Sequence, residues 1–433
     1  MIIWSSLTDT EKQQALARPT ASSSRQTSDT VAQIINRVEK DGDAAVIDFT
    51  RQFDCPDLTT LKLDAQTLDT LADSLDSSVA RAINRAYNNI HAFHSAQMPT
   101  DVTMETSPGV RCELKYTALE HVGIYIPGGS APLPSTVLML GVPARVAGCQ
   151  RITLCTPPNK QGSVTPEIAY AARKCGVTEV FLCGGAQAIA AMALGTQSIR
   201  KADKIFGPGN SYVTEAKQQV SLRPDGAAID MPAGPSEVLV IADADANPAF
   251  VASDLLSQAE HGPDSQAILV SNSEALIADV KQAVEEQLES LSRADIARTA
   301  MQNARYILTE TMDEAAAVSN QYAPEHLIVQ TAQSADFLPK LKNAGSVFVG
   351  PWSPESAGDY ASGTNHVLPT YGYAKNYSSL GLLDFMRRYT IQELSATGIK
   401  DLGPTIMSLA QAEGLDAHSN AVAIRLDALK EES

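Results

Sequence analysis

The 433-residue sequence has no long apolar run and no signal-peptide pattern. No stretch reaches the ~18 consecutive apolar residues that a membrane-spanning helix needs. The first four residues, Met1 to Trp4, are followed by Ser, Thr, Asp and Glu, so both a basic region and an apolar core are missing there. We therefore expect a cytoplasmic protein that has no membrane partner.

Positive charge is scarce relative to negative charge. The chain has 33 Lys and Arg against 50 Asp and Glu, which gives a formal net charge of -17 at pH 7. Such a chain repels a phosphate backbone, and no Lys/Arg run offers a basic patch, so we expect no nucleic-acid partner. The length indicates two or more domains with sizeable cores, and 44% hydrophobic residues are typical of a globular protein.

Three motifs with specific chemistry are also absent. The six cysteines contain no C-x-x-C pair and stand mostly in apolar contexts without a nearby histidine, which favours reduced, buried thiols. There is no G-x-S-x-G serine elbow and no G-x-G-x-x-G dinucleotide fingerprint. A serine hydrolase of that type and a standard Rossmann site are therefore not expected.

The apolar pattern predicts an α/β protein. Helices are expected over 31–53, broken at Gly42, and over 68–93, and strands over 110–114 and 121–126. Apolar strands then alternate with helices up to residue 349, which predicts two parallel sheets covered on both faces. Residues 351–380 are rich in Gly, Ser, Pro and Tyr and should form a long functional loop, and the last 50 or so residues should form two helices joined near Gly414. The expected strands after 126 are 151–155, 179–183, 204–206, 237–242, 266–270, 306–308, 326–330 and 346–349.

Four of the seven histidines lie after residue 260, with carboxylates close by in the sequence. Imidazole, carboxylate and amide oxygens together can hold a borderline divalent metal, and His or Glu can move protons near neutral pH. Metal-assisted or acid–base catalysis is therefore the leading interpretation. The segments concerned are 257–264, Glu325-His326, Gly358-Asp359-Tyr360, and Glu413 with His418.

Each local pattern also has a simpler explanation. Gln258 and His261 lie three apart at a helix end and share a face, yet a lone histidine there is often a surface or capping residue. Glu325 and His326 open a strand, where adjacent side chains point to opposite faces, so one could be core and the other exposed. The alternative is a base and a water activator at the sheet edge where α/β sites lie.

Three glycine-rich turns are candidate binding segments, and two of them could hold an anionic group. The turns at 207–210 and 184–187 each follow a strand and precede a helix, whose free N–H groups suit a phosphate. The turn at 125–130 adds the aromatic Tyr125, and Ser236 supplies a hydroxyl in a further turn. A tight strand-to-helix connection is the commoner explanation for the turns at 207–210 and 184–187.

Longer segments carry a family resemblance. Residues 205–210 (IFGPGN), 230–237 (DMPAGPSE), 257–264 (SQAEHGPD), 324–326 (PEH) and 362–366 (SGTNH) are similar, in this order, to the histidinol dehydrogenase family. The resemblance covers essentially the whole chain. It implies an NAD-linked, four-electron oxidation of L-histidinol to L-histidine, the last step of histidine biosynthesis, with two NAD+ and one zinc ion per subunit.

The resemblance also implies an architecture: two Rossmann-like parallel-sheet domains, small terminal segments and a domain-swapped homodimer. The implied boundaries are a small N-terminal segment at 1–19, a first Rossmann-like domain at 20–124 and 236–380 on the substrate and metal side, a second at 125–235 on the NAD side, and a swapped C-terminal helical segment at 381–433.

The site residues follow from the same resemblance. It implies that Glu325 and His326 transfer protons, and that Glu413 and His418 serve the partner's site. The implied zinc ligands are Gln258, His261, Asp359 and His418; the NAD contacts are Tyr125, Gln187 and Asn210; the substrate contacts are Ser236, Gln258, His261, His326, Asp359, Glu413 and His418.

Two other functions remain open from the residues themselves. A metallohydrolase with zinc-bound water and Glu325 as base would share the metal motif but would have no use for the glycine turns. A metal- or nucleotide-binding module without catalysis would not need Glu325 and His326.

Overall fold

The computed structural model describes residues 1–18, 25–128, 132–231 and 234–431. The chain divides into two compact units, Met1–Gln97 with Leu119–Phe385, and Met98–Ala118 with Met386–Ser433. The first unit holds two sheets. Within the described ranges, no helix is long and apolar enough to cross a membrane.

One sheet of the first unit is built around β5, and we call it the β5 sheet. All neighbouring strands are parallel except the short β2, which runs antiparallel to β7. Its strand order is β2-β7-β6-β5-β8-β9, with β2 at Lys62–Leu63, β5 at His121–Tyr125, β6 at Arg151–Thr156, β7 at Glu179–Leu182, β8 at Lys204–Phe206 and β9 at Ala228–Ile229.

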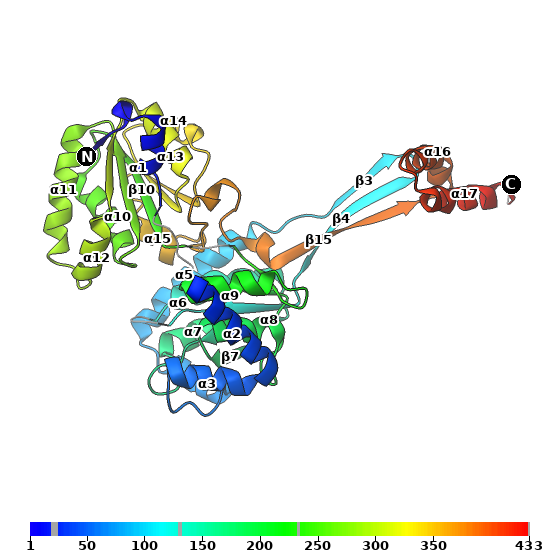
Figure 1. The fold of residues 1–433 in the computed structure, drawn as a ribbon, viewed down its shortest axis with the longest axis horizontal. Helices are drawn as coiled ribbons and strands as arrows, with labels where there is room; N and C mark the ends of the chain where they lie inside the picture. Colours follow the sequence, from blue (N-terminus) through cyan, green and yellow to red (C-terminus); the bar gives the residue numbers. More distant parts are fainter. Residues whose placement is uncertain (19–24, 129–131, 232–233, 432–433) are drawn as a thin grey trace. The chain divides into compact units, whose positions relative to one another are not determined.

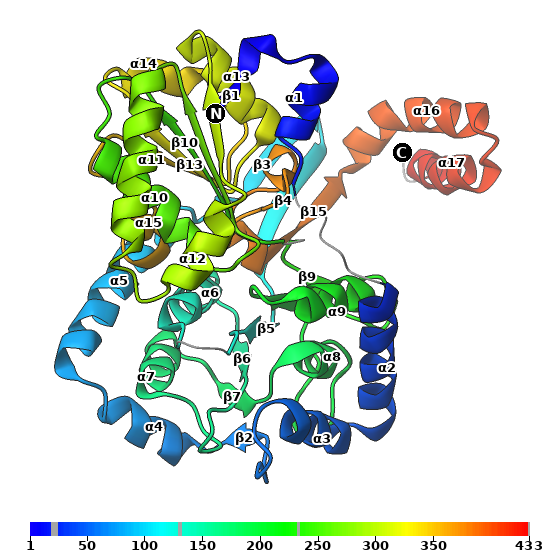
Figure 2. The ribbon, with the colours of Figure 1, turned by 60° about the vertical axis from the view of Figure 1, so that its left-hand side comes forward.

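Helices cover both faces of the β5 sheet, four on each (Figure 2). The helix α2 shows why: Val31, Ile34, Ile35 and Val38 recur at helical spacing and are all buried. The expected single helix over 68–93 is split in two, because Asp76 caps a new helix with its carboxylate. One face carries α2 (Arg25–Asp41), α3 (Asp43–Phe53), α8 (Gly185–Leu194) and α9 (Ser211–Ser221); the other carries α4 (Ala65–Asp73), α5 (Ser77–Ser95), α6 (Pro134–Ala147) and α7 (Pro166–Cys175).

This packing differs from the expected domain assignment, which grouped 20–124 with 236–380. The helices α2 to α5 pack on helices of the β5 sheet, and β2 and β5 are strands of it. They therefore belong with residues 125–235. The sequence could not decide this, because an apolar stripe shows that a helix packs against something without identifying the sheet.

The other sheet of the first unit, the β10 sheet, is entirely parallel. Its order, β1-β12-β11-β10-β13-β14, repeats that of the β5 sheet around the central strand, although the sequence shows no internal repeat. The strands are β1 (Ile2–Ile3), β10 (Glu237–Ala242), β11 (Gln266–Ser271), β12 (Arg305–Leu308), β13 (His326–Gln330) and β14 (Ser346–Val349). The expectation of two parallel sheets is confirmed.

Both faces of the β10 sheet are also covered by helices (Figure 1). Alternate residues of β10 separate two cores: Val238 and Val240 pack on one face, Leu239 and Ile241 on the other. The first face carries α10 (Pro248–Ala259), α11 (Glu274–Leu288) and α12 (Ala294–Met301), and the second carries α1 (Asp9–Ala15), α13 (Met312–Tyr322) and α14 (Ser334–Phe337). The loop after β14 contains the short helix α15 (Glu355–Tyr360).

The second unit is an antiparallel three-stranded sheet followed by two helices. The order is β15-β4-β3, with β3 at Val102–Ser107, β4 at Val110–Ala118 and β15 at Met386–Leu394. The helices α16 (Ala396–Ala412) and α17 (Asp416–Glu431) join at Gly414, as expected. The expectation that 381–433 is helical was wrong for β15, because this strand is exposed along nearly its whole length and so lacks apolar alternation.

Candidate functional site

The adjacent residues Glu325 and His326 are both buried, with 6% and 4% of their surfaces exposed. The alternative in which one of them faces solvent is therefore excluded. His326 is the first residue of β13, and its Nδ1 lies 3.6 Å from Glu325 Oε2. The two side chains are thus close enough to share a proton.

Both members of this pair contact the backbone of Glu237, the first residue of β10. The Glu237 amide donates to Glu325 Oε2 at 2.8 Å, and the Glu237 carbonyl lies 3.2 Å from His326 Nδ1. Since a carbonyl can only accept, Nδ1 carries the hydrogen. In the neutral imidazole Nε2 is then the free base, and it has no hydrogen-bond partner among the described residues.

Two carboxylates from α15 complete the surroundings of His326. Asp359 Oδ1 lies 3.6 Å from Nε2, and Glu355 Oε1 lies 3.9 Å from Nδ1. Glu355 and Asp359 are four apart on one helix, so they share a face. Ligand atoms of His261, Glu355 and Asp359 all lie within 4.8 Å of one another. We call His261, Glu325, His326, Glu355 and Asp359 the His326 cluster.

Gln258 is buried completely on the last turn of α10, three residues before His261. Neither its amide oxygen nor its amide nitrogen has a hydrogen-bond partner among the described residues. A buried amide without partners costs ~1–3 kcal/mol, so such groups usually serve a ligand. Within the described ranges, both oxygens of Glu355 lack a hydrogen-bond partner as well. These imidazole, carboxylate and amide donors suit a borderline divalent metal.

Burial and mutual charge shift the pKa values in the His326 cluster. Burial raises the pKa of Glu325 to about 7 and that of Glu355 to about 8. Burial acts to lower the pKa of His326, but the carboxylates of Glu355, Glu325 and Asp359 outweigh it and raise that pKa. Burial acts to raise the pKa of Asp359, while its contact with His326 lowers it. Glu325 and Glu355 therefore have pKa values near neutral pH, which is typical of carboxyl groups in functional sites.

The position of the cluster corrects one expectation. Sites in open α/β sheets lie outside the carboxyl ends of the strands. Glu237 and His326 instead begin their parallel strands, which are paired in register from Val238–His326 onward, so this cluster lies at the amino edge. His261 reaches the same edge because α10 runs back from the opposite edge and ends just before it.

The other expected substrate and metal residues fall in different places. Ser236 precedes β10, and its carbonyl accepts from the Gln266 amide at 3.0 Å, so it lies at the same edge as His326. Glu413 follows α16 and His418 lies in the first turn of α17. Both are exposed, and both belong to the second unit.

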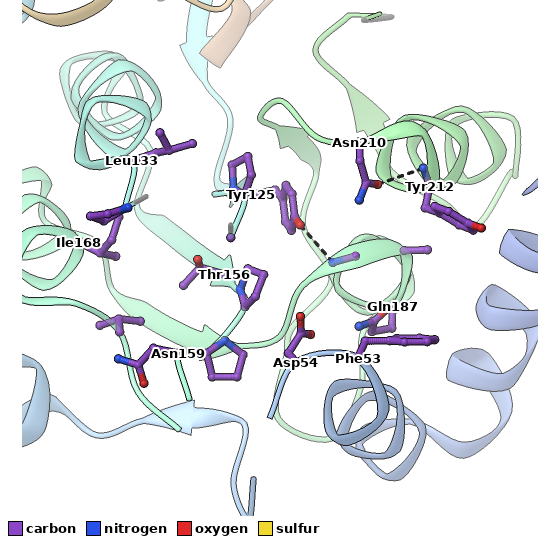
Figure 3. Close-up of a pocket in the computed structure, with 18 of the residues that line it drawn as sticks. Phe53, Asp54, Tyr125, Leu133, Thr156, Asn159, Ile168, Gln187, Asn210 and Tyr212 are labelled. Carbon is purple, nitrogen blue, oxygen red and sulfur yellow. Dashed lines mark hydrogen bonds between the residues drawn. The ribbon is translucent and has the colours of Figure 1, made fainter. Parts of the chain in front are cut away.

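A separate cavity of about 920 Å³ opens at the carboxyl edge of the β5 sheet (Figure 3). Tyr125 ends β5, Gln187 lies in the first turn of α8 and Asn210 caps α9, and all three line this cavity. The three residues expected to contact NAD are thus brought together. The volume is large enough for a dinucleotide.

Glycine is required at two turns of this cavity. Gly207 has φ +127°, and a Cβ there would approach the Tyr125 carbonyl to 2.2 Å. Gly185 has φ +63°, and its amide donates to the Tyr125 hydroxyl at 3.1 Å. The buried pair Lys217–Asp230 fixes the first turn, since Lys217 Nζ donates to the Gly207 carbonyl and the Gly207 amide donates to Asp230.

Sequence reasoning missed two residues. Glu355 stands four residues before Asp359, and this i, i+4 spacing of carboxylates in a loop was the available signal. Asp54, which lines the 920 Å³ cavity, follows α3 far from any motif. Nothing in its local sequence marks it, because only the packing of α3 beside α8 brings it to the cavity.

The fold and the two sites define an α/β enzyme with a dinucleotide-sized cavity and a buried acid–base cluster suited to a metal. Residues 16–426 match the model of the family described as histidinol dehydrogenase. A histidinol dehydrogenase from Idiomarina loihiensis is 56% identical over 430 residues, which cover 99% of this chain and 97% of that protein. One from Vibrio parahaemolyticus is 54% identical, covering 99% and 98%.

A solved structure gives the same result. The crystal structure of histidinol dehydrogenase from Elizabethkingia anophelis has a TM-score of 0.94 at 46% identity, covering 98% of this chain and 97% of that one. The chain belongs to the histidinol dehydrogenase family. It is therefore an NAD-dependent oxidoreductase of the last step of histidine biosynthesis, and the function expected from the resemblance is confirmed at this level.

Proposed function

We propose that this chain oxidises L-histidinol to L-histidine through L-histidinal in two NAD-linked steps at the His326 cluster. The observation that carries the proposal is the buried Glu325–His326 pair beside the convergent donors His261, Glu355 and Asp359. A proton acceptor and a water activator therefore lie side by side next to groups that can bind a cation.

The donor set fits zinc. Gln258, His261 and Asp359 would hold it from this copy, and His418 would come from a second copy. The unpartnered buried amide of Gln258 supports this assignment, because a metal would satisfy its oxygen. Zinc would supply orientation and charge for the nitrogen and oxygen groups of histidinol.

His326 removes the proton of the substrate alcohol during the first oxidation. In the neutral imidazole, Nδ1–H is bound to the Glu237 carbonyl and Nε2 is the accepting atom. A zinc ion held by Asp359 would offset the carboxylate charge that raises the pKa of His326, and so would favour this neutral form. The Nε2 atom faces Asp359 at 3.6 Å, so the proton arrives beside a carboxylate that stabilises the imidazolium. NAD+, when bound, would supply the nicotinamide that accepts the electron pair as hydride.

Glu325 acts between the two oxidations. The aldehyde must gain water before a second hydride can leave, and Glu325 takes a proton from that water as it attacks. Its pKa, raised to about 7 by burial, suits a base near neutral pH. The amide of Glu237 holds one carboxylate oxygen at 2.8 Å and leaves the other for water. His326 then accepts the second alcohol proton.

The cavity of the β5 sheet is assigned to NAD+. Tyr125, Gln187 and Asn210 would contact it, and the amide groups at the starts of α8 and α9 would face its pyrophosphate. Asn210 already caps α9 by accepting from the amides of Tyr212 and Val213, which fixes its side chain at the cavity wall.

We assign Ser236, Gln258, His261, His326 and Asp359 to the substrate contacts of this chain's own site. Glu413 and His418 would serve the corresponding site of the partner in a swapped homodimer. The second unit supports this assignment because it leaves large apolar side chains exposed, which is typical of a surface that meets another chain. These are Val102, Met104, Tyr389, Ile391, Leu394, Leu409, Leu415 and Ile424.

The test is the stoichiometry of a complete reaction. Zinc-loaded protein is mixed with limiting L-histidinol and excess NAD+, and nicotinamide absorbance and histidine are measured. We expect two reduced nicotinamides and one histidine per histidinol. Zinc-loaded protein that forms no reduced nicotinamide would overturn the proposal in favour of the metallohydrolase.

A further inference from the structure

The cavity assigned to NAD+ has one charged side chain among its described lining residues, Asp54. The others are apolar, aromatic, hydroxyl or amide residues. None is Lys or Arg, and the sequence places no basic residue at 19–24, 129–131 or 232–233 either. The cavity wall is therefore negative where a dinucleotide with two phosphates must bind.

The Asp54 carboxylate points into this cavity on the side of Tyr125 (Figure 3). It is partly buried, and no side-chain hydrogen bond or ion pair of the described residues involves it. Burial alone raises its pKa to about 6, which shows that the folded protein disfavours its charge. Charged side chains that lower the stability of the folded protein in this way are typical of ligand-binding sites.

We propose that Asp54 accepts hydrogen bonds from the adenosine ribose hydroxyls of the dinucleotide and selects NAD+ over NADP+. The proposal rests on the assignment of this cavity to NAD+. A carboxylate accepts from the 2′- and 3′-hydroxyls, whereas a 2′-phosphate brings like charge against it. Because no Lys or Arg lines the described wall, nothing offsets that repulsion. The pyrophosphate needs no side-chain cation, since the helix amides of α8 and α9 can face it.

Two small ligands isolate this contact from catalysis. ADP-ribose and 2′-phospho-ADP-ribose differ only at the 2′ position, and neither carries nicotinamide. Their binding to the zinc-loaded protein is measured by calorimetry for the parent chain, Asp54→Asn and Asp54→Ala. Asp57→Asn is the matched control, because Asp57 is an exposed carboxylate three residues further on that does not line the cavity.

Asp54→Ala should weaken the binding of ADP-ribose about tenfold, which is the usual effect of losing a charge-assisted hydrogen bond. Both Asp54 variants should bind 2′-phospho-ADP-ribose more tightly than the parent, so the preference for ADP-ribose falls at least about tenfold. Asp57→Asn should change neither affinity. With full substrate, the ratio of kcat/KM for NAD+ to that for NADP+ should fall in the same two variants.

An unchanged preference in both Asp54 variants, with circular dichroism showing a folded chain, would overturn the proposal. So would a loss of affinity for nicotinamide mononucleotide with none for ADP-ribose, which would place the carboxylate at the other ribose. Failure of the cavity assignment is distinct: the parent chain would then bind neither ADP-ribose nor NAD+.

Discussion

Arg18 forms a two-point ion pair with Glu237 across the amino edge of the β10 sheet, Nε to Oε1 at 2.5 Å and Nη2 to Oε2 at 2.9 Å. Its guanidinium also lies over the Tyr322 ring, 3.8 Å from the centroid. Glu237 in turn contacts Glu325 and His326 through its backbone. Arg18 is therefore linked through Glu237 to Glu325 and His326, the proposed proton-transfer pair.

Arg18→Gln should lower kcat about tenfold with a smaller change in KM, because Glu237 would no longer hold the pair in place. It should also cost about 3 kcal/mol of folding stability, since it leaves the Glu237 carboxylate, whose side chain is 2% exposed, without its cation. Steady-state kinetics well below the melting temperature and denaturant unfolding measure the two effects. Arg37→Gln is the control: it breaks a surface pair with Asp48 and should cost less than about 1 kcal/mol. A destabilised variant with normal kcat would leave Arg18 a structural residue.

Glu325→Gln and His326→Asn should fail at different steps. With Glu325→Gln, a single turnover should yield about one reduced nicotinamide per site and stop at the aldehyde, since His326 still accepts the alcohol proton. His326→Asn should yield almost none. Rapid-quench measurement of nicotinamide and histidinal separates the two, and equal loss of both steps in Glu325→Gln would refute the water-activating role.

Gln258→Leu should raise the stability of the metal-free protein by about 1 kcal/mol, because it replaces an unpartnered buried amide with an apolar side chain. The same change should remove much of the rise in melting temperature that zinc produces in the parent chain. Calorimetric melting with and without zinc measures both. A variant that keeps the full zinc-dependent rise contradicts the ligand assignment.

A mixture of two inactive variants tests the shared site. In a swapped dimer, His326→Asn and His418→Ala chains refolded together should regain about a quarter of the parent activity, because half the dimers are mixed and each mixed dimer has one complete site. His326→Asn mixed with Glu325→Gln should regain nothing, since both changes lie in the same half of each site. No recovery in the first mixture, with mixed dimers verified by mass, would rule out the swap.

Asp54→Asn should stabilise the protein in a pH-dependent way. The pKa of Asp54 rises from 3.8 to about 6 on folding, so the folded state holds the proton more strongly and stability falls as pH rises through this range. The loss of folding stability is complete above pH 6, where Asp54 has given up its proton in the folded state as well. Burial raises the pKa of the neighbouring Tyr125, and a hydrogen bond with Cys155 raises that of Cys183, so neither neighbour is charged in this pH range. The variant should melt higher than the parent at pH 8 and equally at pH 3.5; an equal gain at both would refute the pKa shift.

The sequence by itself determined the element types, the alternation that requires parallel sheets, and the family. Those features are local: the helical spacing of Val31 to Val38 and the capping of α10 by Asn247 act within a few residues. Long motifs such as 257–264 indicated the family and the expected zinc ligands. The strand β15 was not predicted, because only its pairing with β4, far away in the chain, makes this segment a strand.

Tertiary structure alone decided where the candidate site residues lie. It placed α2 to α5 on the β5 sheet, put His326 at an amino edge, and brought Glu355 to within 3.9 Å of it. It also placed Asp54 in the lining of the cavity and, by burial, raised the pKa of Glu325 to about 7. The physical reason is that burial and charge–charge distance depend on residues that meet only after folding, and no local pattern encodes them.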